Sequence, residues 1–595
     1  MQVLRNIFEF SQESPLIFTR LYFWVFFAIV LSFYTIIYKY RAFRSAYLFV
    51  VSLFFYYKTS GIFFLLLIFS TLVDYSIGYV IYNSQEKWLK KIFVGLSILV
   101  NIGVLCYYKY AYYFVTLING YFHTNFEVVD YIAEWTNLFA GTHFDTSIIL
   151  LPVGISFFTF QTISYSLDVY LGKLKPVRNI LDFGFYVSYF PQLVAGPIVR
   201  ASEFIPQIYD DYKLTKQEFG YAIFCILNGL IKKMVIGDYL AVNFIDRVFE
   251  NPSMFTGFEN LMGLYGYSLQ VYCDFSGYTD IAIGVALLMG FRLPANFNSP
   301  YKALSTADFW RRWHMSLSRW LKDYLYIPLG GNRNASFFTY LSVPLILGVM
   351  IMHNGWNWIY FGFFIAAIIF WYLYIKKKKN FWAFISMYFL VFLGFLIGPS
   401  NWVALGFMLA IVVVWLLEMY VPGATKYIIT DANLMLTMLI GGLWHGPGTK
   451  WVIWGGLNGL GLVVYKLWRK VSPYEKYNNW LARFWKILLT FNFITFTRFF
   501  FRGADMPRIG QMMKQIGTNF EAGLIPQMTK SYWPIFSIMA IGYIIHWLPT
   551  KWKEWYKQAF INTPMWVKGV VCVLAVILIY QARTSDLQPF IYFQF

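Results

Sequence analysis

Histidine side chains are the groups in this sequence best suited to move protons near neutral pH, and there are six of them. His445 lies at the end of a long apolar run, in LMLTMLIGGLWHGPGTKW, with glycines on both sides. Glycines let backbones approach closely and leave space beside the imidazole. An ionisable residue among apolar segments of this length is a functional candidate. We therefore predict that His445 is a catalytic base, with a structural helix-packing histidine as the alternative.

His314 lies in a second polar motif, DFWRRWHMSLSRWLKDYLYIPLGGNR. Ser305 and Asp308 predict a capping box that starts a helix at about Thr306. On one continuous helix, an apolar stripe would consist of Trp310, Trp313, Leu317 and Trp320. Arg311 and His314 would share another face of this helix. Two interpretations stay open: the helix lies along a membrane interface, or it lines a cavity that presents cations to an anionic ligand.

The remaining candidate groups carry weaker signals. The four cysteines are scattered, and no zinc-binding spacing, nucleophile elbow or phosphate-binding loop occurs. Asp274 and Asp280 flank FSGYT in a predicted polar turn, which is slight support for an acid–base pair. His546, in the apolar run YIIHWL, is predicted to be a hydrogen-bonded interior residue.

Composition indicates which elements must position these residues. Hydrophobic residues make up 59% of the chain and charged residues 13%, whereas soluble domains carry about 25% charged residues. We therefore predict an all-α polytopic membrane protein with about 13 to 16 spans of roughly 20 residues, the first at about residues 17–37. The net charge of +19 comes from basic clusters in short loops, which favours contact with membrane lipid and not nucleic acid. The clusters predicted to face the cytoplasm include Lys39, Arg41, Arg44, Lys173, Lys175 and Arg178.

Four parts can be recognised along the chain. Residues 1–333 and 431–582 are predicted to form the two parts of a membrane core, and residues 583–595 an aromatic tail. Residues 334–430 are predicted to be an inserted module of four spans, because long uncharged runs there break near their middles. Residues 272–333 mix charges, proline and glycine with large apolar side chains. They are expected to form re-entrant or interfacial helices that line a cavity.

Several of these motifs resemble the membrane-bound O-acyltransferase (MBOAT) family. The resemblance is greatest to the bacterial branch that contains the alginate O-acetylation and teichoic-acid D-alanylation membrane proteins. The segments that carry it are residues 151–170, 190–200, 272–301, 308–333 and 436–459. It implies a ring of transmembrane helices around a thin centre, where funnels from both faces meet near a histidine. The family's principal histidine, in LWHG, matches His445, and its second, in RRWH, matches His314.

The resemblance also implies a function. It is that of a membrane O-acyltransferase that moves an acyl group, expected to be acetyl, across the bacterial cytoplasmic (inner) membrane. The donor would be a cytoplasmic thioester, either acetyl-CoA or an acyl carrier protein, with no bound cofactor and no metal. The acceptor would be an extracytoplasmic polysaccharide, reached through a separate extracytoplasmic acyltransferase partner. The alternatives are a multi-span transporter or polymer flippase, and an accessory scaffold without chemistry.

The resemblance further implies roles for individual residues. His445 would be the base for the attacking hydroxyl, and His314 a second proton-handling or orienting group. Arg311 and Asn332 are expected to face the donor's phosphates or pantetheine arm. Residues expected along the donor channel are Trp444 and Asn458.

The aromatic tail ends in PFIYFQF, which resembles the C-terminal motif of the small accessory membrane protein of teichoic-acid D-alanylation systems. Tyr592 carries the only hydroxyl of these seven residues. In one interpretation the tail is an aromatic belt at the membrane interface. In the other it tucks into the protein, where His445 deprotonates Tyr592 and the phenolate attacks the thioester to give an acyl-tyrosine.

Overall fold

The computed structural model describes Phe10 and residues 15–141, 144–193, 196–333, 424–582 and 590. Every regular element in these ranges is a helix, which confirms the all-α prediction. Five of the described helices are long and apolar enough to cross a membrane: Arg41–Asn83, Lys87–Gly120, Lys216–Glu250, Gly257–Leu288 and Met565–Ala582. The predicted total of about 13 to 16 spans includes residues 334–423, which lie outside the described residues, so that total stays a prediction. The first predicted span corresponds to the shorter apolar helix Leu21–Ile37.

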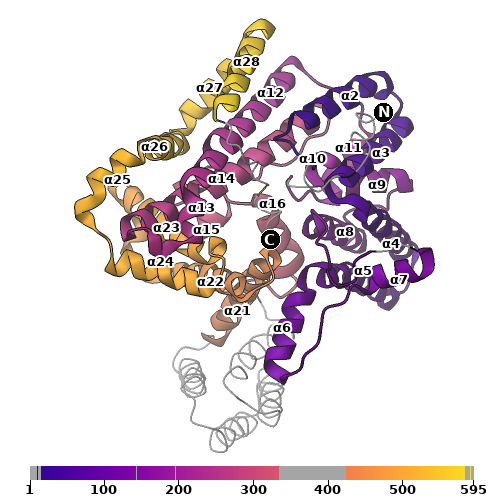
Figure 1. Ribbon diagram of the computed structural model, residues 1–595. Helices are drawn as coiled ribbons and strands as arrows, with labels where there is room; N and C mark the ends of the chain where they lie inside the picture. The colour runs from indigo at the N-terminus through magenta and orange to yellow at the C-terminus, as the bar shows by residue number, and fades with distance from the viewer. Residues whose placement is uncertain are drawn as a thin grey trace, which may run out of the picture.

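The helices before α12 form one group, on the right in Figure 1. Its main members are α2 (Leu21–Ile37), α3 (Arg41–Ser60), α4 (Phe64–Asn83), α5 (Lys87–Leu105), α8 (Ile155–Tyr170) and α9 (Ile180–Ser188). Helices α4, α5 and α8 pack against one another. At their contact the fully buried carboxylate of Asp74 accepts hydrogen bonds from Ser97, Asn101 and Ser166. A buried carboxylate needs such donors, so this cluster fixes how the three helices meet.

Two helices cross the middle of the molecule and contact each other closely. They are α12 (Lys216–Leu230), continued by η3 (Ile231–Asp238), and α14 (Gly257–Leu288). A Cβ atom at Gly229 would lie 2.4 Å from the carbonyl oxygen of Gly277. The absence of a side chain at Gly229 therefore lets the two backbones touch.

The predicted polar turn around Asp274 and Asp280 is wrong. Both residues lie inside α14, where Asp280 pairs with Lys232 at 2.8 Å and Asp274 pairs with Lys233. The charges that suggested a turn are thus neutralised by lysines of η3, and α14 continues as a buried helix. The irregular structure expected over residues 272–333 begins only after Leu288.

The helix predicted to run on from Thr306 is interrupted. It forms α15 (Thr306–Trp310), α16 (Met315–Leu321) and the π-helix η7 (Lys322–Tyr326). The predicted cap is present, because the Ser305 hydroxyl accepts a hydrogen bond from the amide of Asp308 at 3.1 Å. The helix is interrupted between α15 and α16. The residue faces that one continuous helix would have are therefore absent.

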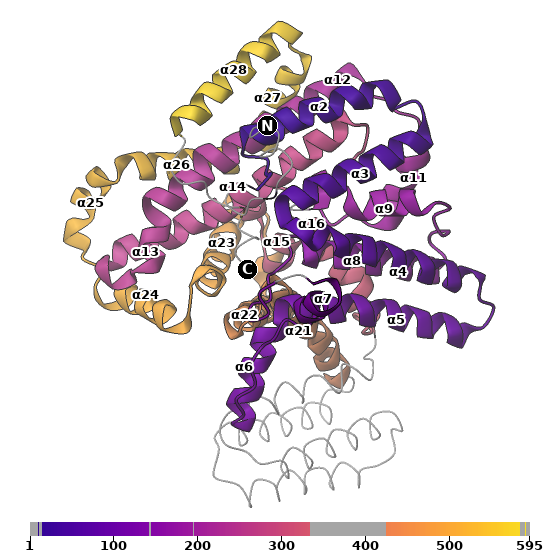
Figure 2. The ribbon, with the colours of Figure 1, turned by 45° about the vertical axis from the view of Figure 1, so that its right-hand side comes forward.

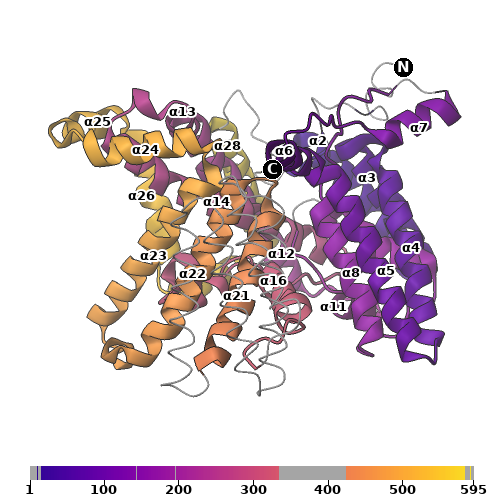
Figure 3. The ribbon, with the colours of Figure 1, turned by 90° about the horizontal axis from the view of Figure 1, so that it is seen from below.

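The last part of the chain forms a second group of helices. Its members include α21 (Ala424–His445), α22 (Thr449–Val471), α23 (Trp480–Arg502), α27 (Thr550–Asn562) and α28 (Met565–Ala582). Figure 3 shows α21, α22 and α23 on one side, α3, α4, α5 and α8 on the other, and α12, α14 and α16 between them. Helices α27 and α28 return to pack along α12, as Figure 2 shows. Of the predicted four-span insertion, residues 334–423 lie outside the described residues. The predicted division of the chain into two core parts, an insertion and a tail stays a prediction.

Candidate active site

His445 is the last residue of α21 and is buried, with 2% of its surface exposed. Its ring centroid lies 5.0 Å from that of Trp454 and 5.4 Å from that of Phe501. The ring of Trp451 stacks with the imidazole at 6.1 Å and 21°. A Cβ atom at Gly446 would lie 2.1 Å from Nε1 of Trp451, so only glycine leaves room for this ring. The glycines around His445 therefore make its aromatic surroundings possible.

His314 lies at the break between α15 and α16 and is fully buried. Its backbone is left-handed, with φ 44°, which few residues other than glycine and asparagine adopt. Nδ1 of the ring lies 3.2 Å from Oδ1 of Asn296. That oxygen also accepts a hydrogen bond from the amide of Ser316 at 3.0 Å. Because an amide oxygen only accepts, Nδ1 carries the ring proton of the neutral imidazole and Nε2 carries the lone pair.

The structure brings the two predicted histidines together. Their ring centroids are 6.4 Å apart. Trp444 lies beside both, 6.0 Å from His314 and 5.0 Å from His445. Its indole nitrogen donates a hydrogen bond to the carbonyl of Ser156 in α8 at 3.3 Å. The centre is thus built from α16, α21 and α8, with both imidazoles buried among aromatic rings.

Of the other predicted site residues, Arg311 and Asn332 are exposed and Asn458 is buried. Arg311 is exposed at the end of α15, and it shares no helix face with His314 because the helix is broken. Asn332 is exposed, and its amide oxygen accepts a hydrogen bond from the Tyr326 hydroxyl at 2.7 Å. Asn458 is buried in α22, where its amide donates to the carbonyl of Trp454 at 2.8 Å. The roles of these residues in donor binding stay predictions.

Phe590 is the one residue of the predicted aromatic tail that the structure describes. It is fully buried, with its ring centroid 4.5 Å from that of Tyr278 and 5.7 Å from that of Phe275. The ring of Phe275 in turn lies 4.6 Å from the imidazole of His314, edge to face. Phe590 itself is therefore packed inside the protein and not at its surface. Tyr592 lies outside the described residues.

Two buried cations near the histidines escaped the sequence analysis. Lys109 lies in the π-helix η2 (Cys106–Tyr110), and its ammonium donates to the carbonyls of Trp444 at 2.9 Å and His445 at 3.1 Å. It therefore satisfies the orphan carbonyls at the end of α21. Arg498 of α23 is 1% exposed and lies over the ring of Trp313. Lys109 is the single basic residue of a long apolar run, and Arg498 lies in another such run, four residues before Arg502. A basic residue inside an apolar run is the sequence signal by which both could be found.

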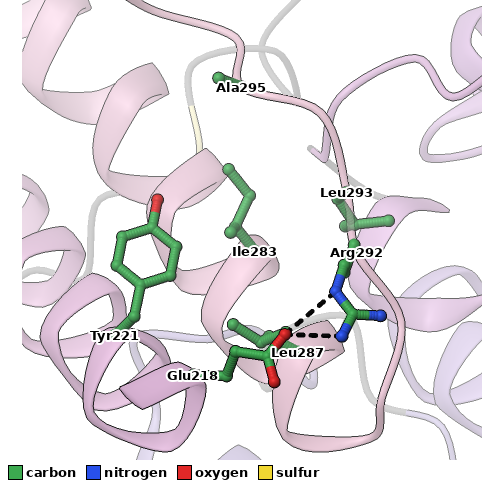
Figure 4. Close-up of a pocket in the computed structure, with 7 residues that line it drawn as sticks. All are labelled: Glu218, Tyr221, Ile283, Leu287, Arg292, Leu293 and Ala295. Carbon is green, nitrogen blue, oxygen red and sulfur yellow. Dashed lines mark hydrogen bonds and ion pairs between the residues drawn. The ribbon is translucent and has the colours of Figure 1, made fainter. Parts of the chain in front are cut away.

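A cavity of about 260 Å³ lies between α12, α14 and the segment after α14. Figure 4 shows the guanidinium of Arg292 facing Glu218, with Nη2 2.6 Å and Nε 3.1 Å from the same carboxylate oxygen. The cavity is also lined by Tyr221, Ile283, Leu287, Leu293 and Ala295. Ala295 directly precedes Asn296, which holds His314. The segment that closes the cavity is therefore connected in the chain to the residue that contacts His314.

Comparison with known proteins gives several matches. Residues 175–419 match the membrane-bound O-acyltransferase family. The peptidoglycan O-acetyltransferase of Helicobacter pylori is 30% identical over 504 residues, which cover 80% of this chain and 74% of that protein. The probable alginate O-acetylase AlgI of Azotobacter vinelandii is 41% identical over 276 residues, 46% of this chain and 51% of that protein. The teichoic acid D-alanyltransferase of Bacillus subtilis is 34% identical over 183 residues, 29% of this chain and 45% of that protein.

This protein belongs to the membrane-bound O-acyltransferase family. It is a multi-pass membrane protein and an O-acyltransferase, which confirms the resemblance seen in the sequence. The finding favours an enzyme over the transporter, flippase and scaffold alternatives. The matches to the Azotobacter vinelandii and Bacillus subtilis proteins cover about half the length of each of those proteins.

Proposed function

We propose that this enzyme takes an acetyl group from a cytoplasmic thioester and passes it across the bacterial cytoplasmic membrane for O-acetylation of a cell-surface polysaccharide. The observation that carries the proposal is the buried pair of His445 and His314, with rings 6.4 Å apart. A thioester is already activated, so the protein must supply a base for the attacking hydroxyl and a site that excludes water. The names of the relatives support acetyl as the acyl group and a polysaccharide as the acceptor.

The two histidines have different proposed roles. His445 takes the proton of the attacking hydroxyl while the hydroxyl oxygen bonds to the thioester carbonyl carbon. When the carbon–sulfur bond breaks, the same proton passes to the departing thiolate. The lone pair on Nε2 of His314 accepts a hydrogen bond from the reacting groups, because its Nδ1 is held by Asn296.

The cavity beside Arg292 is the proposed entrance for the donor. It lies near the face that the sequence predicts to be cytoplasmic, because Arg41 of a predicted cytoplasmic cluster pairs with Asp211, just before α12, at 2.7 Å. Apart from the ion pair of Arg292 and Glu218, its lining is mainly apolar, which suits a pantetheine arm. The donor is acetyl-CoA or an acetyl-loaded carrier protein. The residues proposed to contact it are Arg311, Asn332, Trp444 and Asn458.

Tyr592 is the proposed first acceptor. The burial of Phe590 against Tyr278 and Phe275 supports a tail that enters the protein next to His314. An acyl-tyrosine formed there would be unloaded by an extracytoplasmic acyltransferase partner, which transfers the acetyl group to the polysaccharide. No cofactor beyond the thioester substrate is needed for this sequence of steps.

The test compares ester-linked acetyl groups on surface polysaccharides of cells that carry wild-type enzyme, His445→Ala or no enzyme. His123→Ala serves as the control, because His123 is exposed and outside the site. We expect His445→Ala to match the deletion while membrane levels of the protein stay normal. Normal acetylation with His445→Ala, or no loss of esters in the deletion, would refute the proposal.

A further inference from the structure

Arg498 is a buried cation with spare hydrogen-bond donors and no carboxylate partner within the described part of the chain. It is 1% exposed, and its three guanidinium nitrogens make no close, well-aligned hydrogen bond there. The hydroxyl oxygen of Tyr301 faces the guanidinium and can accept one N–H, while the Tyr301 proton is donated to the carbonyl of Ser268. A guanidinium carries five N–H donors, and an uncompensated buried charge is strongly unfavourable. A buried cation of this kind indicates a functional role.

Two aromatic rings hold the guanidinium in place. Its central carbon lies 4.6 Å from the ring centroid of Trp313 and 5.3 Å from that of Phe501. Cation–π contacts stabilise the charge through the faces of the rings. They consume none of the N–H groups, so the donors stay available for a ligand.

The same two rings connect Arg498 to the histidine centre. Trp313 directly precedes His314 in the chain. Phe501 contacts both Arg498 and His445. Its ring centroid lies 5.3 Å from the guanidinium carbon and 5.4 Å from the centroid of the imidazole. Arg498 therefore lies close enough to His445 for its charge to act on that imidazole.

Other buried or half-buried arginines differ from Arg498 in having carboxylate or carbonyl acceptors. Arg44 donates to the carbonyl of Ile208 and, at 3.1 Å, to that of Asp210. Arg502, one turn further along α23, pairs with Asp246 at 2.8 Å. These contacts explain both as structural residues. Arg498 has no equivalent explanation, which points to a negative charge that is present only when substrate is bound.

We infer that Arg498 is a further catalytic residue that stabilises the negative charge developing on the thioester carbonyl oxygen. The inference rests on the proposed function. As the hydroxyl oxygen bonds to the carbonyl carbon, the π electron pair moves onto the carbonyl oxygen, which accepts hydrogen bonds from Arg498. The pair then returns, the carbon–sulfur bond breaks, and the proton held by His445 goes to the thiolate. Preorganised donors in a dry site are among the strongest contributions to catalysis.

The test uses the full chain, purified and reconstituted in phosphatidylethanolamine and phosphatidylglycerol vesicles. The measured reaction is the release of free thiol from acetyl-CoA or from an acetyl-loaded carrier protein. Because no partner unloads the acyl-tyrosine in these vesicles, kcat here denotes the rate constant of the single thiol burst at saturating donor, and KM the donor concentration that gives half of that rate. Arg498→Met is compared with Arg502→Met, the matched control on the same helix. Thermal unfolding is followed for each variant.

Arg498→Met is expected to lower kcat by about 10²–10³-fold, as loss of an oxyanion donor does, with KM for the donor little changed. Its Tm should equal or exceed that of the wild type, because an unpaired buried charge is removed. Arg502→Met should keep kcat and lower Tm, because it leaves Asp246 without its partner. This opposite pattern separates a catalytic arginine from a structural one.

If Arg498→Met keeps the wild-type kcat, the inference is overturned, even when its KM rises or its Tm falls. In that case Arg498 would bind the donor before reaction, or only stabilise the fold. A wild-type protein that releases thiol from neither donor would instead overturn the proposed function, and this inference with it. The two failures are thus distinguishable.

Discussion

The rings of His445 and His314 lie 6.4 Å apart, although one ends α21 and the other precedes α16. The predicted four-span insertion separates them in the sequence. Their contact therefore depends on how the second half of the chain docks against the first, and on the left-handed backbone that turns His314 inward. This arrangement makes several neighbouring residues essential for reasons that can be tested separately.

Asn296→Ala should reduce turnover strongly, because the Asn296 side chain fixes the protonated nitrogen of His314 and also binds Ser316. Loss of a buried acceptor should cost about 1–3 kcal/mol of folding stability. Initial rates and thermal unfolding of the purified variant measure the two effects. Full activity in a folded Asn296→Ala protein would show that the orientation of His314 is unimportant.

Gly446→Ala should displace either Trp451 or His445, because the new Cβ atom would lie 2.1 Å from the indole nitrogen. Overpacking of this kind costs about 1–3 kcal/mol. Gly448→Ala is the matched control, since its Cβ atom would be 3.8 Å from the same ring. Equal activity and Tm for both variants would contradict the described packing.

Lys109→Met should lower both kcat and Tm, because the carbonyls of Trp444 and His445 lose their donor. We expect a loss of about 1–3 kcal/mol for these buried groups. Lys109→Arg, which keeps the charge and the donors, should retain part of the activity. If Lys109→Met behaves like the wild type in kinetic and unfolding assays, the end of α21 does not depend on this lysine.

Tyr592→Phe should abolish polysaccharide acetylation almost as fully as His445→Ala, because it removes the proposed acceptor oxygen and keeps the ring. Mass spectrometry of wild-type protein exposed to the thioester donor should find an acetyl group on Tyr592. Phe590→Ala, a variant that removes the described anchor, should weaken acetylation without removing the acceptor. Near-normal acetylation in Tyr592→Phe would show that Tyr592 is not the acceptor and that the tail acts only as an anchor.

The sequence was sufficient to find the histidines because a polar motif in an otherwise apolar chain has few structural explanations. His445 and His314 stand out against their surroundings, and so does the cap at Ser305. Asp274 and Asp280 give a false signal of a turn, because their neighbours resemble a turn while their charges are neutralised by lysines from another helix. Such pairing depends on tertiary structure and has no local signal.

The break at His314 was also beyond sequence reasoning. A left-handed backbone at a histidine is unusual, and here it depends on the contacts that Asn296 makes with His314 and Ser316. Lys109 and Arg498 were missed because a basic residue in an apolar run resembles a membrane-end anchor. Their burial beside the active centre follows only from the packing of α21 and α23.

The most direct test of the central claim is thiol release from acetyl-CoA or an acetyl-loaded carrier protein by purified enzyme in sealed vesicles, with His445→Ala and His314→Ala beside the wild type. We predict that the wild type releases thiol, that His445→Ala releases none above the vesicle background, and that His314→Ala is strongly impaired. Rates for His445→Ala equal to those of the wild type would contradict the claim that these two histidines form the acyl-transfer centre.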